Sequence, residues 1–179
     1  NYFGRGPSLS PDGSQIAFSS PRTGNGDIYL MMLNGTVVQR LTSSEAFECD
    51  ASFSGNGKKI VFVRESEGCG DIWVMDSDGT NQKQLTVGNG DEGSPRFVGD
   101  GGQVVFWRNT PELESRVGIA RSREIVLLDT TTSTEIRLTD NLVEDVFPSA
   151  SRDGNLVGFV REGQLIIHNI KEKKETCLG

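Results

Sequence analysis

The sequence predicts an all-β fold in which one unit of four short strands is repeated four times. Three observations support this prediction. A motif close to Pro-x-x-Ser-Pro-Asp-Gly-x-x-Ile-x-Phe, followed by Asp-Ile-Tyr and Leu-Thr, recurs along the chain. The copies follow one another at nearly constant spacing, and a period of roughly 40 to 50 residues with a turn in each copy is typical of stacked β-sheet modules. The chain also contains 22 glycines, so many turns are expected.

The copies are aligned by a turn glycine and by a phenylalanine five residues beyond it. The aligned pairs are Gly13 and Phe18, Gly57 and Phe62, Gly101 and Phe106, and Gly154 and Phe159. The first two steps between glycines are 44 residues each, and the third is 53 residues because one loop of the third copy is longer. We therefore predict a single domain over residues 1–179, with repeats at about 7–42, 50–86, 94–139 and 148–179.

Each copy supplies four strands in order. The first ends at a turn such as Pro11-Asp12-Gly13, where proline presets φ and glycine accepts a positive φ. In the second copy the next two strands are Lys58 to Val63 and Ile72 to Met75. The fourth strand follows Asp78-Gly79, a dipeptide favoured in two-residue hairpins, and ends at Leu85-Thr86.

The second and third strands contain consecutive apolar residues, such as Ile60-Val61-Phe62-Val63 and Ile125-Val126-Leu127-Leu128, so both faces of each sheet must be covered. A four-stranded sheet covered on both faces by copies of itself is a blade of a β-propeller. Three assemblies are compatible with four blades: a closed four-bladed ring, part of a larger propeller, or half of a ring formed by a homodimer.

The repeat resembles the WD-like repeat of TolB-type β-propellers, which also occurs in propeller domains attached to some serine peptidases. The resemblance runs from about Pro7 to Gly179; the third copy has Gly99-Asp100-Gly101 in place of Pro-Asp-Gly, and the fourth ends in Leu178-Gly179 in place of Leu-Thr. It implies a periplasmic or otherwise extracytoplasmic location. It does not specify a function, because repeats of this kind serve many roles.

Composition excludes several classes of function. The formal net charge is −7, the sequence pI is about 4.8, and the 18 basic residues are scattered, which argues against a nucleic-acid surface. No apolar run reaches the roughly 18 to 20 residues of a membrane span, so we expect no membrane insertion. The chain begins at Asn1, and we expect a processed form or a piece of a longer protein.

The sequence offers little catalytic chemistry. It has one histidine, His168, at a third-strand position, and it lacks a Gly-x-Ser-x-Gly elbow, a phosphate-binding loop and metal-spaced Cys or His pairs. We therefore predict a protein without enzyme activity, cofactor or metal. Of the three cysteines, Cys49 and Cys69 lie in loops on the same face, so they either form a disulfide or remain free thiols, whereas Cys177 stays unpaired.

The loops that link one copy to the next are acidic at one register. Six residues beyond the threonine of each Leu-Thr stand Glu48, Glu92 and Asp145, and the same loops contain Asp50, Asp91 and Glu144. In a propeller these loops surround one mouth of the central channel, where repeated carboxylates would attract a cation, an ammonium group or a basic peptide. The alternative is a structural role, in which each carboxylate accepts hydrogen bonds from nearby backbone N–H groups.

The long insertion of the third copy, Asn109 to Arg123, opens on the same face. Its Thr110-Pro111-Glu112 indicates a helix start, and Arg116, Arg121 and Arg123 give it an excess of positive charge. Two hypotheses follow, a lid or partner contact over the acidic mouth and a solvated loop.

Three functions remain after these exclusions. The first is a non-catalytic scaffold that binds a protein or peptide partner through its acidic loop face. The second is a propeller domain that gates or docks substrate for an attached serine peptidase or hydrolase. The third is a carbohydrate-binding propeller.

Overall fold

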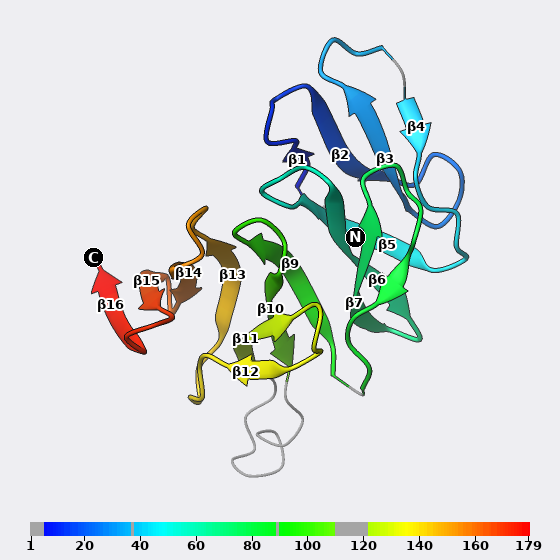
Figure 1. Ribbon diagram of the computed structural model, residues 1–179. Coiled ribbons are helices and arrows are strands. Elements are labelled where there is room, and N and C mark those ends of the chain that lie inside the picture. Colours follow the sequence, from blue (N-terminus) through cyan, green and yellow to red (C-terminus); the bar gives the residue numbers. More distant parts are fainter. Residues whose placement is uncertain (1–5, 37, 89, 110–121) are drawn as a thin grey trace.

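The computed structural model describes residues 6–36, 38–88, 90–109 and 122–179. These residues form four four-stranded antiparallel sheets, and within each sheet the strands lie in chain order (Figure 1). Among the described residues no helix is long and apolar enough to cross a membrane. The predicted all-β fold of four propeller blades is therefore confirmed.

The strand bounds follow the four repeats. The first sheet contains β1 (Ser8–Leu9), β2 (Gln15–Ser20), β3 (Asp27–Met32) and β4 (Val38–Arg40). The second contains β5 (Phe47–Phe53), β6 (Lys59–Ser66), β7 (Cys69–Asp76) and β8 (Lys83–Gln84). The third contains β9 (Glu92–Val98), β10 (Gln103–Asn109), β11 (Arg123–Asp129) and β12 (Glu135–Arg137). The fourth contains β13 (Asp145–Ala150), β14 (Leu156–Arg161), β15 (Gln164–Asn169) and β16 (Lys174–Leu178).

The Ser-Pro-Asp-Gly motif forms the turn between the first two strands of a sheet. Gly13 has φ of 71°, as predicted for this reversal. The Ser10 hydroxyl donates a hydrogen bond of 2.6 Å to Asp12 Oδ1, and the Ser14 N–H donates one of 3.0 Å to the same oxygen. These bonds, the one from Ser10 first, lower the pKa of Asp12 to about 2. The motif is therefore a self-contained turn in which the aspartate satisfies local donors.

The threonine of Leu-Thr joins the fourth strand to the third. In three of the sheets the threonine hydroxyl accepts a hydrogen bond of 2.9 Å from a backbone N–H of the third strand. The donor is the residue fourteen positions earlier in the chain. The pairs are Ile28 with Thr42, Ile72 with Thr86, and Ile125 with Thr139. The motif therefore recurs because each sheet needs the same closure at the end of its outer strand.

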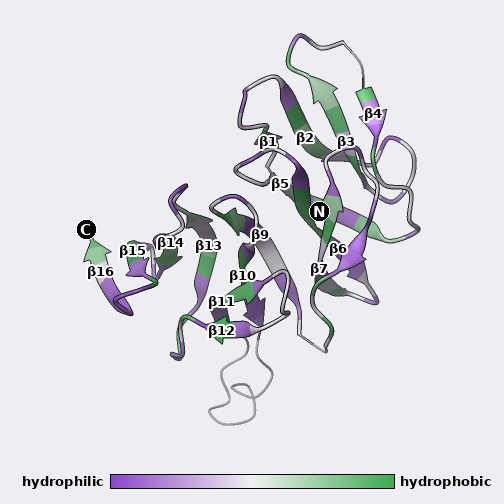
Figure 2. Cartoon of the chain, viewed as in Figure 1, coloured by the Kyte–Doolittle hydropathy of each residue, from purple (hydrophilic) through white to green (hydrophobic). Residues whose placement is uncertain are grey.

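Hydrophobic cores lie between consecutive sheets. In β6, Val61 and Val63 pack toward the third sheet, whereas Ile60 and Phe62 pack toward the first. This alternation explains the continuous apolar runs, because neighbouring residues in a strand point to opposite faces and both faces are buried. Figure 2 shows hydrophobic residues on central strands such as β2 and β3, while the outer strands β4 and β12 are largely hydrophilic.

The four sheets form an open arc (Figure 1). The inner strands β5, β9 and β13 each contact strands of the preceding sheet, whereas among the described residues the fourth sheet makes no comparable contact with the first. Apolar side chains at the two ends are correspondingly exposed, for example Leu9 at 58% and Leu165 at 44%. The arrangement is that of part of a propeller and not of a closed four-bladed ring. Assembly with a second copy stays a prediction.

Candidate functional site

The three carboxylates at the predicted register lie at the start of the inner strands or beside it, and each is bound by an arginine. Glu48, Glu92 and Asp145 are 0%, 4% and 0% exposed. The Nε atoms of Arg64, Arg108 and Arg161, each sixteen residues further on, donate to them over 2.6, 2.6 and 2.7 Å. Each pair therefore joins the first strand of a sheet to the end of its second strand.

Further hydrogen bonds complete these pairs. The hydroxyl of Thr86 donates to Glu92 Oε2, and Arg108 also forms two hydrogen bonds, of 2.5 and 2.8 Å, with the carboxylate of Glu135 on the outer strand. Burial raises the pKa of Glu92, while the bonds to Glu135 and the charge of Glu92 raise the pKa of Arg108. The carboxylates thus lie inside the blades instead of on an open acidic rim, and they are bound by side chains, not by the backbone N–H groups that the structural alternative predicted. Their participation in binding stays a prediction.

The neighbouring acidic residues contact adjacent segments. Asp50 is 3% exposed and accepts a hydrogen bond of 3.1 Å from the backbone N–H of Ser94 in the next sheet. Asp91 accepts one of 3.1 Å from the backbone N–H of Gly70. Glu144, which is half exposed, lies 3.7 Å from Nη1 of Arg123. These three residues therefore hold the loops between sheets in place.

The arginine-rich insertion is described only at its ends. Arg116, Arg121 and the predicted helix start at 110–112 lie outside the described residues. Arg123 begins β11, and its guanidinium lies over the ring of Trp107 at 4.5 Å from the centroid. The hypothesis of a lid over the acidic mouth stays a prediction.

The cysteines and the histidine all lie within strands. Cys49 is buried, Cys69 half-buried and Cys177 exposed, and none of the three forms a disulfide, so the disulfide alternative is not the arrangement observed. His168 is 6% exposed within β15, with Nδ1 at 3.7 Å from Glu175. Among the described residues no group of His, Cys, Asp and Glu is arranged to hold a metal ion.

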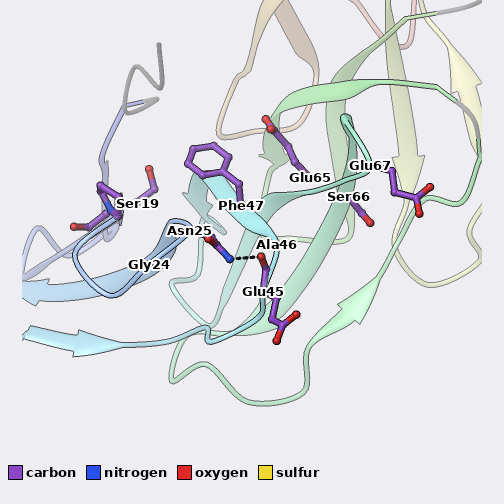
Figure 3. A pocket seen from close by; sticks show the side chains of 11 residues that line it. Ser19, Gly24, Asn25, Glu45, Ala46, Phe47, Glu65, Ser66 and Glu67 are labelled. Carbon is purple, nitrogen blue, oxygen red and sulfur yellow. Dashed lines mark hydrogen bonds between the residues drawn. The ribbon is translucent and has the colours of Figure 1, made fainter.

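A pocket of about 670 Å³ opens between the first and second sheets. It lies on the linker face, which we define as the face formed by the β2–β3, β6–β7 and β14–β15 loops and the linkers β4–β5, β8–β9 and β12–β13. Figure 3 shows side chains from three segments around it. The lining residues are Ser19, Ser20, Pro21, Gly24, Asn25, Glu45, Ala46, Phe47, Glu65, Ser66 and Glu67.

The pocket wall depends on a close approach between Gly26 and Phe47. A Cβ atom on Gly26 would lie 2.4 Å from Cδ2 of the Phe47 ring, and the residue has φ of 116°, so only glycine fits there. The backbone N–H of Glu48 donates a hydrogen bond of 3.0 Å to the Gly26 carbonyl. The Asn25 side chain donates to the carbonyl of Glu45 (Figure 3). The β2–β3 loop and the β4–β5 linker are therefore fixed to each other before any ligand binds.

Sequence reasoning drew attention to the linkers between copies but missed the residues that line this pocket. Glu45 and Glu67 are not repeated in the other copies, and Glu65 recurs only as Glu162 in the fourth, whereas the predicted carboxylates recur in three linkers. The signal that could have revealed them is the acidic turn Glu65-Ser-Glu67 of the second copy, which has no counterpart in the first.

The fold is that of a partial β-propeller, with a pocket between its first two blades. Residues 1–165 match the TolB beta propeller domain family. The chain therefore belongs to that family.

Solved structures agree with this assignment. TolB from Acinetobacter baumannii is 26% identical with a TM-score of 0.78, and the match covers 97% of this chain and 43% of that one. A putative TolB from Agrobacterium tumefaciens is 24% identical with a TM-score of 0.79, over 96% of this chain and 63% of that one. The chain thus spans less than two thirds of either relative. Puromycin hydrolase is 13% identical with a TM-score of 0.71, and the match covers 99% of this chain and 28% of that one. At this identity the likeness shows the fold alone. No curated protein matches the chain.

Proposed function

We propose that this chain is a non-catalytic propeller module that binds a protein or peptide partner at the linker face. The observation that carries the proposal is the pocket between the first and second sheets. Its volume of about 670 Å³ lies within the roughly 300 to 1,000 Å³ typical of ligand sites. Family membership gives the fold and leaves the ligand open, so the proposal depends on the pocket.

The composition of the pocket supports binding rather than catalysis. Its serines, Ser19, Ser20 and Ser66, have no histidine or lysine beside them among the lining residues. A hydroxyl nucleophile needs such a base within hydrogen-bonding distance. We also propose an extracytoplasmic location, which the resemblance to TolB-type propellers implies. No described residue specifically favours the hydrolase-associated or carbohydrate-binding alternatives.

A pocket-filling variant tests the proposal. Ser19 lies at the position that Trp107 occupies in the third sheet, so a tryptophan placed there extends from the end of β2 toward the pocket. We expect peptides selected from a random displayed library to lose about tenfold or more in affinity for Ser19→Trp, a loss of about 1.4 kcal/mol. Ser66→Trp, at the exposed last residue of β6, should act in the same way.

The matched control is Leu33→Trp, which adds the same side chain at an exposed position on the opposite face. Selected peptides should bind this variant as they bind the unmodified chain. Peptides that bind all variants equally, or a library that yields no specific binder, would contradict the proposed function.

A further inference from the structure

Within the chain, every junction between consecutive sheets is built from the same positions of the repeat. We call the side of a sheet that packs on the next sheet its forward face, and the side that packs on the preceding sheet its backward face. The forward face supplies one residue of the second strand, two of the third strand and the leucine of Leu-Thr. In the first three sheets these residues are Ala17, Ile28, Leu30 and Leu41; Val61, Ile72, Val74 and Leu85; and Val105, Ile125, Leu127 and Leu138.

The fourth sheet has a forward face of the same kind. Leu178 is 54% exposed there, whereas Leu41 at the same position of the first sheet is 7% exposed. Leu165 is likewise exposed, while Ile28 at its position in the first sheet is fully buried. Among the described residues no sheet covers this face, which lies at one end of the arc (Figure 1). The fourth sheet therefore presents apolar residues that the other sheets bury against a neighbour. At the four positions it has Gly158, Leu165, Ile167 and Leu178.

A hollow of about 380 Å³ lies on this face. Val160 and Leu165 are among the residues that line it, and Gly158, which also lines it, contributes no side chain. In the first three sheets alanine or valine stands at the position of Gly158 and shares a core with a phenylalanine of the next sheet, for example Ala17 with Phe62. The hollow therefore lies where the backward face of a following sheet places its aromatic ring.

The first sheet carries the matching backward face at the other end of the arc. In the second sheet the backward face contains Phe53, Ile60, Phe62 and Met75, all of which are buried against the first sheet. In the first sheet the same positions hold Leu9, Ile16, Phe18 and Met31. Leu9 is exposed, and the other three are only half-buried. One chain therefore presents both halves of the junction that it forms internally three times.

A polar contact of the internal junction also has its counterpart at the two ends. At the first junction the backbone N–H of Phe53 donates a hydrogen bond of 3.2 Å to Oγ of Ser8. On the fourth sheet the position of Ser8 is occupied by Ser149, which is exposed, and on the first sheet the position of Phe53 is occupied by Leu9. A junction between the fourth sheet and a first sheet can therefore repeat this hydrogen bond, with the Leu9 N–H as donor and Ser149 Oγ as acceptor.

We propose that the forward face of the fourth sheet binds the backward face of the first sheet of a second copy of this chain. The Phe18 ring of one copy enters the hollow over Gly158 of the other, and the exposed leucines of both faces become buried. A second copy is the partner that the structure favours, because its own sequence supplies a backward face of this repeat and the contact continues the internal junctions. The inference does not depend on the pocket between the first and second sheets.

The contact joins different surfaces of the two copies, so it generates a closed ring where successive rotations close and an open assembly where they do not. Separate chains lose translational and rotational freedom that the internal junctions do not lose. We therefore expect a dissociation constant of about 10 μM for a single contact. The chain is then a single copy at about 1 μM, whereas at about 100 μM light scattering should give an average mass above that of one copy.

Two variants, each with one face disabled, test the contact. Leu9→Glu places a carboxylate in the backward face, and Leu165→Glu/Leu178→Glu places two in the forward face. A carboxylate buried among apolar side chains without a cation is unfavourable, so each change should weaken association about a hundredfold or more. Each variant alone should be largely monomeric at about 100 μM, because every contact needs one face of each kind. An equimolar mixture should form a one-to-one complex of twice the 19.5 kDa mass of the chain, since the two intact faces meet once.

The matched control is Val87→Glu/Leu142→Glu, which adds two carboxylates at exposed apolar positions in the linkers, away from both ends of the arc. This variant should associate as the unmodified chain does. Circular dichroism verifies the fold of each variant. Where a glutamate variant fails to fold, Leu9→Ser and Leu165→Ser/Leu178→Ser make the same comparison.

Three results would overturn the inference. The first is an unmodified chain that stays monomeric at about 100 μM. The second is association of Leu9→Glu alone that is lost in Leu165→Glu/Leu178→Glu, because it would show that two forward faces pair with each other. The third is equal association of all variants and the control, which would place the contact away from the ends of the arc. Recovery of a one-to-one complex on mixing two monomeric variants would support it.

Discussion

Replacement of Arg108 by leucine is expected to lower the free energy of unfolding by about 3 kcal/mol at pH 7. Arg108 is the cation for Glu92, which is 4% exposed, and also holds Glu135 on the outer strand. Leucine keeps much of the packing against the Phe106 ring, over which the guanidinium lies at 5.2 Å, but leaves a buried carboxylate without its cation. Urea unfolding followed by circular dichroism measures the change.

The pH dependence of this loss identifies its cause. Burial already raises the pKa of Glu92, and without Arg108 it should rise further. Glu92 then takes up a proton in the folded state, so the variant regains stability as pH falls through that raised pKa. The deficit should be smaller at pH 5 than at pH 7. An equal deficit at both pH values would show that lost packing, and not the unpaired carboxylate, is responsible.

The control for charge removal is Arg152→Leu, an exposed position in the turn before β14. Within the described residues its side chain has no ion pair, and we expect a change within about 0.5 kcal/mol.

Truncation of Phe62 to alanine is expected to cost about 3 to 5 kcal/mol. Phe62 is 0% exposed and packs in the core between the first and second sheets, with Ala17 and Ile28 on the opposite side. The loss combines the transfer of the ring to water with the cavity left in the core. Thermal or urea unfolding of the purified variant measures it.

Phe18 provides a matched comparison for Phe62. It stands at the same register in the first sheet and is only half-buried, because Phe62 packs toward the preceding sheet and the first sheet has no such neighbour among the described residues. Phe18→Ala should therefore cost clearly less than Phe62→Ala. Equal losses would contradict the open arc, because they would mean that the first sheet is covered on both faces.

The repeat made most of the fold predictable. The turn at Gly13, the strands around Phe62 and the closure by Thr86 each follow from local chemistry that recurs in several copies. The open arc was not predictable, because the same repeat serves closed and partial rings. The insertion at 110–121 has no counterpart in the other copies and so could not be placed by comparison.

The candidate site was harder to predict for the same reason. Repetition led to Glu48, Glu92 and Asp145, and the structure shows that these carboxylates bind arginines within their own sheets. A feature that every blade needs is repeated, whereas a pocket arises where one copy departs from the others. Ser19 is such a departure, because the other copies have Val63, Trp107 and Val160 at its position.

The measurement that tests the binding account most directly is a titration of the isotope-labelled chain with a peptide selected from the displayed library, followed through backbone amide chemical shifts. The account predicts changes concentrated at Asn25, Gly26, Phe47 and Ser66, around the pocket between the first and second sheets. Changes confined to the third and fourth sheets, with these four amides unmoved at saturation, would contradict it.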